Sequence, residues 1–177
     1  TLKREFAEVI VTTGALPKTL PVKGFNKCIT FKQLLLNEVD AGDKICFFGG
    51  GQSSCEAAYE MVLQGKHSMI VEMADDLIVT PGICLANTSF LRDMLKFKQV
   101  PVYLKHTITE IGDGYVVVKG PDGEAKKLEC DSVINGIGFV PAPVGGTGKN
   151  IHRVGDCVAI GNLRTVIWRA WDVCMAI

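Results

Sequence analysis

The sequence predicts an α/β fold in which a parallel β-sheet is followed by an antiparallel meander. Two observations carry this prediction: apolar strand-like runs alternate with amphipathic helical stripes from residue 44 to residue 104, and short strands separated by Gly-Asp turns follow up to residue 130. The order β-α-β-α-β requires parallel strands joined by right-handed crossovers. A chain of 177 residues with 47% apolar content can bury a core of this kind.

The first strand, helix and strand of this region form one βαβ unit. Residues 44–48 are a nearly continuous apolar run, which is typical of a parallel strand covered on both faces. Three glycines follow directly, and the next apolar residues fall on one helical stripe, namely Cys55, Ala58, Tyr59, Val62 and Leu63. We expect this helix to end near Gly65 and the second strand to cover residues 68–72.

A second helix, another strand and the meander continue the chain. Pro81 and Gly82 precede a helical stripe formed by Ile83, Ala86, Phe90 and Met94, and residues 100–104 are the next predicted strand. The meander strands are expected at residues 106–111, 115–119 and 125–130. Gly-Asp-Gly and Gly-Pro-Asp-Gly turns between them favour antiparallel pairing.

The flanking segments are predicted as strands at residues 8–13, 132–135 and 151–154 and as helices at residues 31–37 and 165–177. Residues 141–150 form a short glycine-rich passage, which is either an ordinary flexible return loop or an engineered join. Because the chain starts at Thr1 without methionine and stops within a predicted helix, we expect an excised fragment.

Charge and composition exclude several partners. The chain contains 19 Lys and Arg against 19 Asp and Glu, so no net field attracts it to nucleic acid or to a charged membrane. No apolar run approaches the roughly 20 residues of a membrane helix, and no signal-peptide region is present. We therefore expect a cytoplasmic protein with no membrane or nucleic-acid partner.

The cysteines and histidines predict neither a metal site nor a nucleophile. Seven cysteines are scattered without a Cys-x-x-Cys pair, which disfavours both disulfides and zinc. His67, His106 and His152 have no second ligand or nucleophile at a recognisable spacing. We expect no metal and no catalytic side chain.

The glycine run predicts a Rossmann-like dinucleotide site. A pyrophosphate needs backbone N–H donors at close range, and Gly49 and Gly51 remove the side chains that would hold the backbone away. The third position of the G-x-G-x-x-G pattern is Ser54, a small-residue variant. The loop follows a strand and starts a helix, so we expect Gly49, Gly50, Gly51, Gln52, Ser53 and Ser54 to bind the cofactor.

Glu72 predicts which dinucleotide binds. It ends the second strand about 20 residues after the loop, where an acid can accept hydrogen bonds from the adenosine ribose hydroxyls. A 2′-phosphate would face like charge there. Residues 73–76 add two acids and no arginine, so the sequence favours NAD(H) over NADP(H).

Four motifs in order carry a family resemblance: Thr12 to Pro17, Gly49 to Ala58, Asn135 to Pro141, and Val154-Gly155-Asp156-Cys157. This succession resembles the pyridine-nucleotide-dependent flavoproteins of the glutathione reductase type. The resemblance implies an NAD(H)-binding domain at residues 42–141, inserted into an FAD domain of which residues 1–41 and 142–177 are partial segments.

The same resemblance implies roles for single residues. The further positions it assigns to cofactor binding are Thr13, Gly14, Gly136, Gly138, Gly155 and Asp156, with Asp156 on the FAD ribityl chain. Glu56 matches an acid near the nicotinamide, and the alternative of a solvated helix residue stays open. The first FAD glycine loop of the family is missing, so we do not expect this fragment to bind FAD tightly.

Residues 162–173 are similar to the C-terminal end of the 2-enoate reductase and 2,4-dienoyl-CoA reductase group. Those enzymes carry an upstream FMN barrel and an iron–sulfur cluster. The resemblance implies an NADH-binding electron-entry unit that passes hydride to FAD, with an activated C=C bond as the final acceptor. Thioredoxin reductases carry a Cys-x-x-Cys before the NAD glycine loop, whereas residues 25–44 contain only Cys28.

Two alternatives stay open at this point. One is a non-catalytic module that binds NADH or mediates assembly, and the other is an NADH oxidase or diaphorase with a different acceptor. A homo-oligomer is also left open. In each flavoprotein interpretation the cofactors carry the chemistry and the protein supplies placement.

Overall fold

The computed structural model describes residues 2–79 and 82–177, the first two of them as backbone only. The chain forms two compact units, one covering Thr19–Gly138 and the other combining the residues up to Lys18 with Phe139–Ile177. Each unit is described by itself. Nowhere in the described residues does a helix reach the length and apolar character needed to cross a bilayer.

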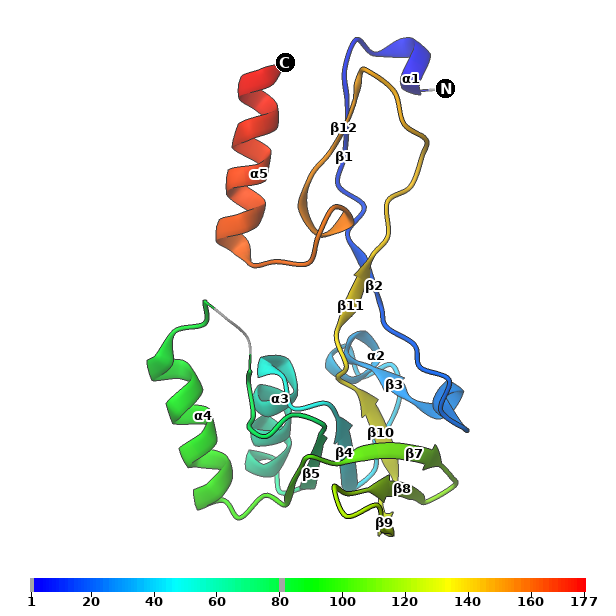
Figure 1. Cartoon of the computed structure of the whole chain (residues 1–177), viewed down its shortest axis with the longest axis vertical. Coiled ribbons are helices and arrows are strands. Elements are labelled where there is room, and N and C mark those ends of the chain that lie inside the picture. The colour runs from blue at the N-terminus through cyan, green and yellow to red at the C-terminus, as the bar shows by residue number, and fades with distance from the viewer. Residues whose placement is uncertain (1, 80–81) are drawn as a thin grey trace. The chain divides into compact units, whose positions relative to one another are not determined.

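The larger unit is built on a five-stranded sheet with the order β3-β10-β4-β5-β6 (Figure 1). Its strands are β3 (Ile29–Thr30), β4 (Lys44–Phe48), β5 (His67–Glu72), β6 (Val102–Leu104) and β10 (Ser132–Asn135). All neighbouring strands are parallel. From β4 the chain proceeds to β5 and β6 on one side and returns to β10 on the other. Open α/β sheets bind ligands at the carboxyl ends of strands where the order reverses in this way.

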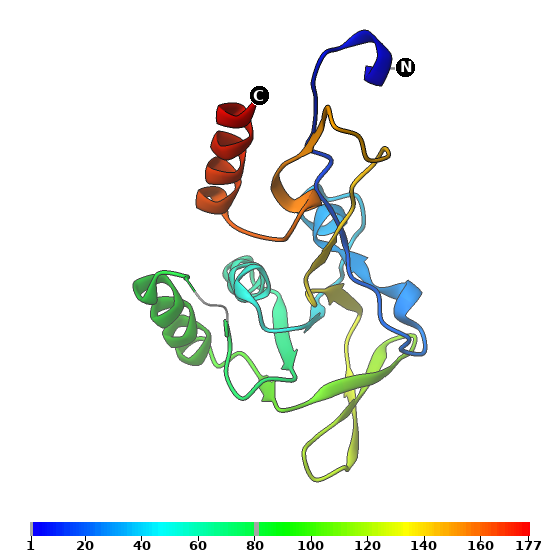
Figure 2. The ribbon, with the colours of Figure 1, turned by 45° about the horizontal axis from the view of Figure 1, so that its top comes forward.

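Successive residues of β4 point into two different cores. Ile45 and Phe47 pack with α3 (Gln52–Leu63) and α4 (Leu85–Phe97), while Cys46 and Phe48 pack with the meander. Helices α3 and α4 contact each other and lie side by side in both views (Figure 1, Figure 2). The sheet is therefore the middle layer between two helices and the meander, which explains its nearly continuous apolar sequence.

The meander consists of β7 (Thr107–Ile111), β8 (Tyr115–Lys119) and β9 (Ala125–Glu129). Its strands pair antiparallel, with a register shift between Ile108 and Glu110. The short helix α2 (Phe31–Leu35) follows β3 directly and begins with a capping box between Thr30 and Gln33. A 3-10 turn, η1 (Phe25–Lys27), precedes β3.

The smaller unit contains two separate strand pairs. Its elements are α1 (Leu2–Glu5), β1 (Val9–Val11), β2 (Ala15–Pro17), β11 (Phe139–Pro141), β12 (Ile151–Arg153), the 3-10 turn η2 (Gly155–Cys157) and α5 (Leu163–Ala176). β1 pairs with β12 in parallel, and β2 pairs with β11 antiparallel. Asn162 and Thr165 form a capping box that starts α5.

The α/β fold with a parallel sheet and an antiparallel meander is confirmed. The helical stripe predicted for α4 is wrong by about one position, because the helix starts at Leu85 and buries Thr88, Leu91 and Leu95, leaving Phe90 53% exposed. The predicted strand 8–13 is shorter than expected. Gly14 has a left-handed φ of 73°, so a turn separates β1 from β2.

The division into units differs from the boundaries expected at residues 41 and 141. Residues 19–41 belong to the larger unit because β3 adds to the edge of its sheet beside β10. Residues 139–141 belong to the smaller unit because β11 pairs with β2. The assignment of the units to NAD(H) and FAD stays a prediction.

Candidate functional site

The glycine loop lies at the point where the strand order of the larger sheet reverses. Gly49 donates its N–H to Val71 O on β5 at 2.8 Å, and Gly136 donates to Phe48 O at the end of β4 at 2.9 Å. A Cβ on Gly49 would lie 2.6 Å from Gly136 O, and φ of Gly49 is 104°. The loop after β4 and the loop after β10 therefore approach each other in a way that only glycine allows.

Gly50 is held by the last residue of β5 and by the segment that follows β5. Its N–H donates to Glu72 Oε2 at 2.5 Å, and its carbonyl accepts from the Ile78 amide at 2.9 Å. A Cβ on Gly50 would lie 2.5 Å from Leu77 Cδ2. Gly51 differs, since no heavy atom lies within 4 Å of its Cβ position. The open side of the loop is therefore at Gly51, next to the start of α3.

Glu72 is anchored as an acceptor beside this loop. Its Oε1 accepts from the Ala74 amide at 2.7 Å, in addition to the Oε2 bond from Gly50. A carboxylate offers about four lone-pair sites, so two amide bonds leave capacity for ligand hydroxyls. Glu72 is thus joined to the glycine loop by a direct hydrogen bond, and its role toward the ribose stays a prediction.

The first turn of α3 has amides that no side chain caps. Gly51 is the N-cap residue and makes no side-chain cap hydrogen bond. Exposed N–H groups and the helix dipole together favour an anion at this position. Gln52 donates from Nε2 to Glu56 Oε1 at 2.7 Å, so Glu56 is an exposed acid paired within its own helix. Ser53 is exposed.

Ser54 occupies the third position of the glycine pattern and is almost fully buried, at 1% exposure. Its hydroxyl contacts the place where a Cβ on Gly136 would be, and among the described residues Ser54 Oγ has no hydrogen-bond partner. The hydroxymethyl group is therefore accommodated by a glycine on the opposite loop. Gly138 follows with a left-handed φ of 94°.

The expected FAD residues lie in the smaller unit. Asp156 Oδ1 accepts from the Gly161 amide at 3.1 Å, and Gly155 has a φ of 79°. Thr13 Oγ1 donates to Ala142 O at 2.9 Å and accepts from the Val144 amide at 3.2 Å. The parallel pairing of β1 with β12 and the Val154 amide, which donates to Val11 O at 3.0 Å, place the Thr-Gly and Gly-Asp motifs after neighbouring strands of one unit.

Sequence reasoning missed the residues that close the loop from the other side. Leu77 and Ile78 are 5% and 4% exposed, and Arg92 of α4 binds the same segment. The missed signal was the apolar pair after the acids of residues 75–76, which indicates a chain segment that folds back. For Arg92, no spacing rule applies, because it comes from the next helix.

The pKa of the buried Cys55 thiol reflects the charges around the glycine loop. Burial raises its pKa to about 12; the positive charge of Arg92 lowers it, and Glu72, Glu56 and Asp76 raise it. The thiol also donates to Gly50 O at 3.5 Å. Such a thiol stays protonated near neutral pH and serves packing rather than nucleophilic chemistry.

The histidines lie apart from one another. His67 is 3.8 Å from Asp43, His152 is 2.7 Å from Glu8, and His106 Nδ1 is 2.6 Å from Leu104 O. Within residues 2–79 and 82–177 no cluster of three His, Cys, Asp or Glu side chains suitable for a metal is found. The arrangement at the glycine loop offers hydrogen-bond donors and an acid, which suits binding rather than bond breaking.

Comparison with known proteins identifies a matching family and a relative. A family model described as pyridine nucleotide-disulphide oxidoreductase matches residues 1–170. Cinnamate reductase from Clostridium sporogenes is 31% identical over 173 residues, which cover 94% of this chain and 26% of that protein. The chain thus spans about a quarter of this relative.

Two solved structures have a similar fold. A 2-naphthoyl-CoA reductase in complex with 2-naphthoyl-CoA has a TM-score of 0.85 at 23% identity, covering 99% of this chain and 28% of that one. Thioredoxin reductase from T. acidophilum has a TM-score of 0.70 at 23% identity, covering 96% of this chain and 63% of that one.

Proposed function

The chain belongs to the pyridine nucleotide-disulphide oxidoreductase family, and on that premise we propose that its larger unit binds NADH and positions it to deliver hydride to FAD. The family expected from the four sequence motifs is confirmed. The similarity of this chain to the enoate reductase group is confirmed as well. One observation carries the proposal: Glu72 is hydrogen-bonded to Gly50 at the carboxyl edge of the sheet.

The residues around the loop fit a dinucleotide. Gly51 leaves open space, the first turn of α3 has no side-chain cap, and Glu72 keeps acceptor capacity. We infer that the pyrophosphate lies against Gly51 and the amides of Gln52 and Ser53, and that the adenosine ribose donates to Glu72. When bound, NADH supplies the hydride and FAD accepts it, while the chain supplies orientation.

Charge supports NADH over NADPH. Two unit charges at about 4 Å interact by on the order of 4 kcal/mol near a protein surface, so a 2′-phosphate beside the Glu72 carboxylate is disfavoured. Asp75 and Asp76 add negative charge to the same segment. The preference follows from this repulsion and from the hydroxyl bonds that only an unphosphorylated ribose can donate.

The smaller unit is the proposed flavin side. We infer that Asp156 binds the ribityl chain of FAD, supported by its place directly after the left-handed Gly155. We also propose an upstream FMN and iron–sulfur domain, as in the enzymes that residues 162–173 resemble, which would carry electrons onward. The names cinnamate reductase and 2-naphthoyl-CoA reductase suggest an activated, conjugated C=C bond as the final acceptor.

The test is a calorimetric titration of the chain with NADH and with NADPH. We expect NADH to bind at least about tenfold more tightly, and Glu72→Gln to weaken NADH by about tenfold because the carboxylate accepts charge-assisted hydrogen bonds. Glu124→Gln removes the same charge in an exposed turn of the meander and should change neither Kd. Equal or tighter binding of NADPH by the wild type would contradict the cofactor assignment.

A second measurement separates an electron-entry unit from a binding module. FAD is added together with NADH and a dye acceptor, and the flavin-dependent reduction of the dye is followed. Dye reduction supports the oxidoreductase proposal. NADH binding without any such reduction, also in the full-length protein, would favour a module that only binds the nucleotide.

A further inference from the structure

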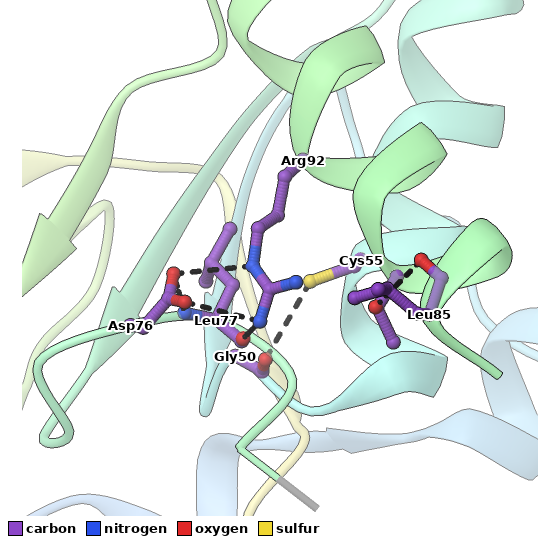
Figure 3. Close-up of polar contacts among 7 residues, drawn as sticks. Gly50, Cys55, Asp76, Leu77, Leu85 and Arg92 are labelled. Carbon is purple, nitrogen blue, oxygen red and sulfur yellow. Dashed lines mark hydrogen bonds and ion pairs between the residues drawn. The ribbon is translucent and has the colours of Figure 1, made fainter. Parts of the chain in front are cut away.

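Arg92 binds the segment of residues 72–78, which borders the glycine loop of the proposed nucleotide site. From α4 its Nε donates to Asp76 Oδ1 at 3.2 Å, and its Nη2 forms an ion pair with Asp76 Oδ2 at 3.0 Å (Figure 3). The same Nη2 donates to Leu77 O at 2.5 Å. A planar guanidinium that binds both oxygens of one carboxylate is strongly oriented.

The segment of residues 72–78 contacts the glycine loop at both of its ends. Glu72 accepts from the Gly50 amide, and Ile78 donates back to Gly50 O. Ile78 has a φ of 55°, an uncommon left-handed value for a β-branched residue. Such a backbone persists only where its surroundings hold it. Arg92 holds the residue before it, and the Leu77 amide also donates to Asp76 Oδ1 at 2.7 Å.

Acidic side chains outnumber basic side chains around the glycine loop. In Figure 3 dashed lines join the guanidinium of Arg92 to Asp76 and to the carbonyl of Leu77. The side chain of Arg92 is 30% exposed, and that of Asp76 is 53% exposed. A second basic residue, Lys105, is exposed. Its backbone amide donates to Ala74 O at 2.9 Å, so Lys105 is also attached to this segment.

We propose that Asp76 is a selectivity-determining residue for the dinucleotide, because it occupies the guanidinium of Arg92 and so withholds that cation from a 2′-phosphate. With Asp76 in place, a 2′-phosphate meets two carboxylates, Glu72 and Asp76, and one guanidinium that is already paired. Without Asp76 the charges of Glu72 and Arg92 cancel, and the N–H groups of Arg92 that bind Asp76 become available. This inference rests on the proposed nucleotide function and deepens it.

The experiment is a double-variant series in which the Kd values of NADH and NADPH are measured by calorimetry. Asp76→Asn should lower the ratio of the NADPH Kd to the NADH Kd by about tenfold, while leaving NADH binding within about threefold. In Asp76→Asn/Arg92→Gln this gain should disappear. In Asp76→Asn/Lys105→Gln it should remain, because Lys105 serves as the matched control cation.

Each outcome decides the inference. A ratio in Asp76→Asn within twofold of the wild type would overturn it, as would a gain that survives Arg92→Gln or one that is lost with Lys105→Gln. Asp76→Ser gives a second test should Asp76→Asn not fold, since its hydroxyl can still accept from the Leu77 amide. Wild-type chain that binds neither dinucleotide would overturn both proposals. Normal NADH binding with an unchanged ratio in both Asp76 variants would overturn this inference alone.

Discussion

The two compact units hold their candidate cofactor residues in different ways. In the larger unit, Gly50 is bound at its N–H and its carbonyl and is covered by Leu77, and the loop stands on strands whose side chains are buried on both faces. In the smaller unit, Asp156 accepts one amide bond, and α5 has no buried residue. Packing of buried side chains therefore shapes the first site, while hydrogen bonds, such as those of Asp156 with Gly161 and of Thr13 with Ala142, shape the second. Substitutions should reveal this difference.

The largest effect is expected from Gly49→Ala in the larger unit. The new Cβ would be 2.6 Å from Gly136 O at a φ of 104°, so we expect a loss of about 3 kcal/mol in the free energy of unfolding. Gly14→Ala in the smaller unit is the matched control, because its φ is 73° and nothing lies within 4 Å. It should cost only about 1–2 kcal/mol. Urea unfolding followed by circular dichroism measures both, and equal losses would contradict the comparison.

Gly51→Ala should separate binding from stability within the larger unit. Its φ is −67° and its Cβ position faces open space, so the free energy of unfolding should change by less than about 1 kcal/mol. NADH binding should weaken by about tenfold or more, since a methyl group would stand between the backbone and the pyrophosphate. Unchanged NADH affinity in the folded variant would show that the dinucleotide does not approach Gly51.

Asp156→Asn tests the smaller unit by itself. We expect about tenfold weaker binding of FAD, followed by flavin fluorescence, because a carboxylate accepts stronger hydrogen bonds than an amide. The free energy of unfolding should stay within about 0.5 kcal/mol, as is usual for a substitution outside the core. NADH affinity should not change. A loss of NADH binding comparable to that of Glu72→Gln would contradict the assignment of Asp156 to the flavin.

The smallest effect concerns the dependence of stability on acid. Amide hydrogen bonds from Lys44 and Asp43 lower the pKa of the Asp131 carboxyl in the larger unit. Its contribution is therefore present above the ordinary aspartate pKa near 3.8 and is lost as the pH falls through the lowered value. Asp131→Asn should flatten the decline of the unfolding free energy below about pH 4. Asp122→Asn, in an exposed turn, is the control, and identical slopes for the two variants would contradict the prediction.

Much of the larger unit follows from local patterns. The run at residues 44–48 predicts a strand covered on both faces because alternate residues must enter two cores, and Ile45 and Cys46 do so. The spacing from the glycine loop places Glu72 at the end of the second strand because a βαβ unit has a nearly constant length, and β5 does end at Glu72. The α4 stripe was misplaced because Phe90 and Leu91 are both apolar, and the start of the helix decides which of them faces the sheet.

Spacing along the chain was sufficient for the fold class, because helices and strands repeat with characteristic periods, and the resemblance of the four motifs was sufficient for the family. The cofactor roles of the glycine loop and of Glu72 stay predictions. Spacing was not sufficient for the contact between Arg92 and Asp76. Arg92 reaches Asp76 only after α4 has packed beside α3, and Ser54 is tolerated only because Gly136 approaches it from another strand. Contacts between residues far apart in the sequence depend on how the layers pack, and no local periodicity encodes that packing.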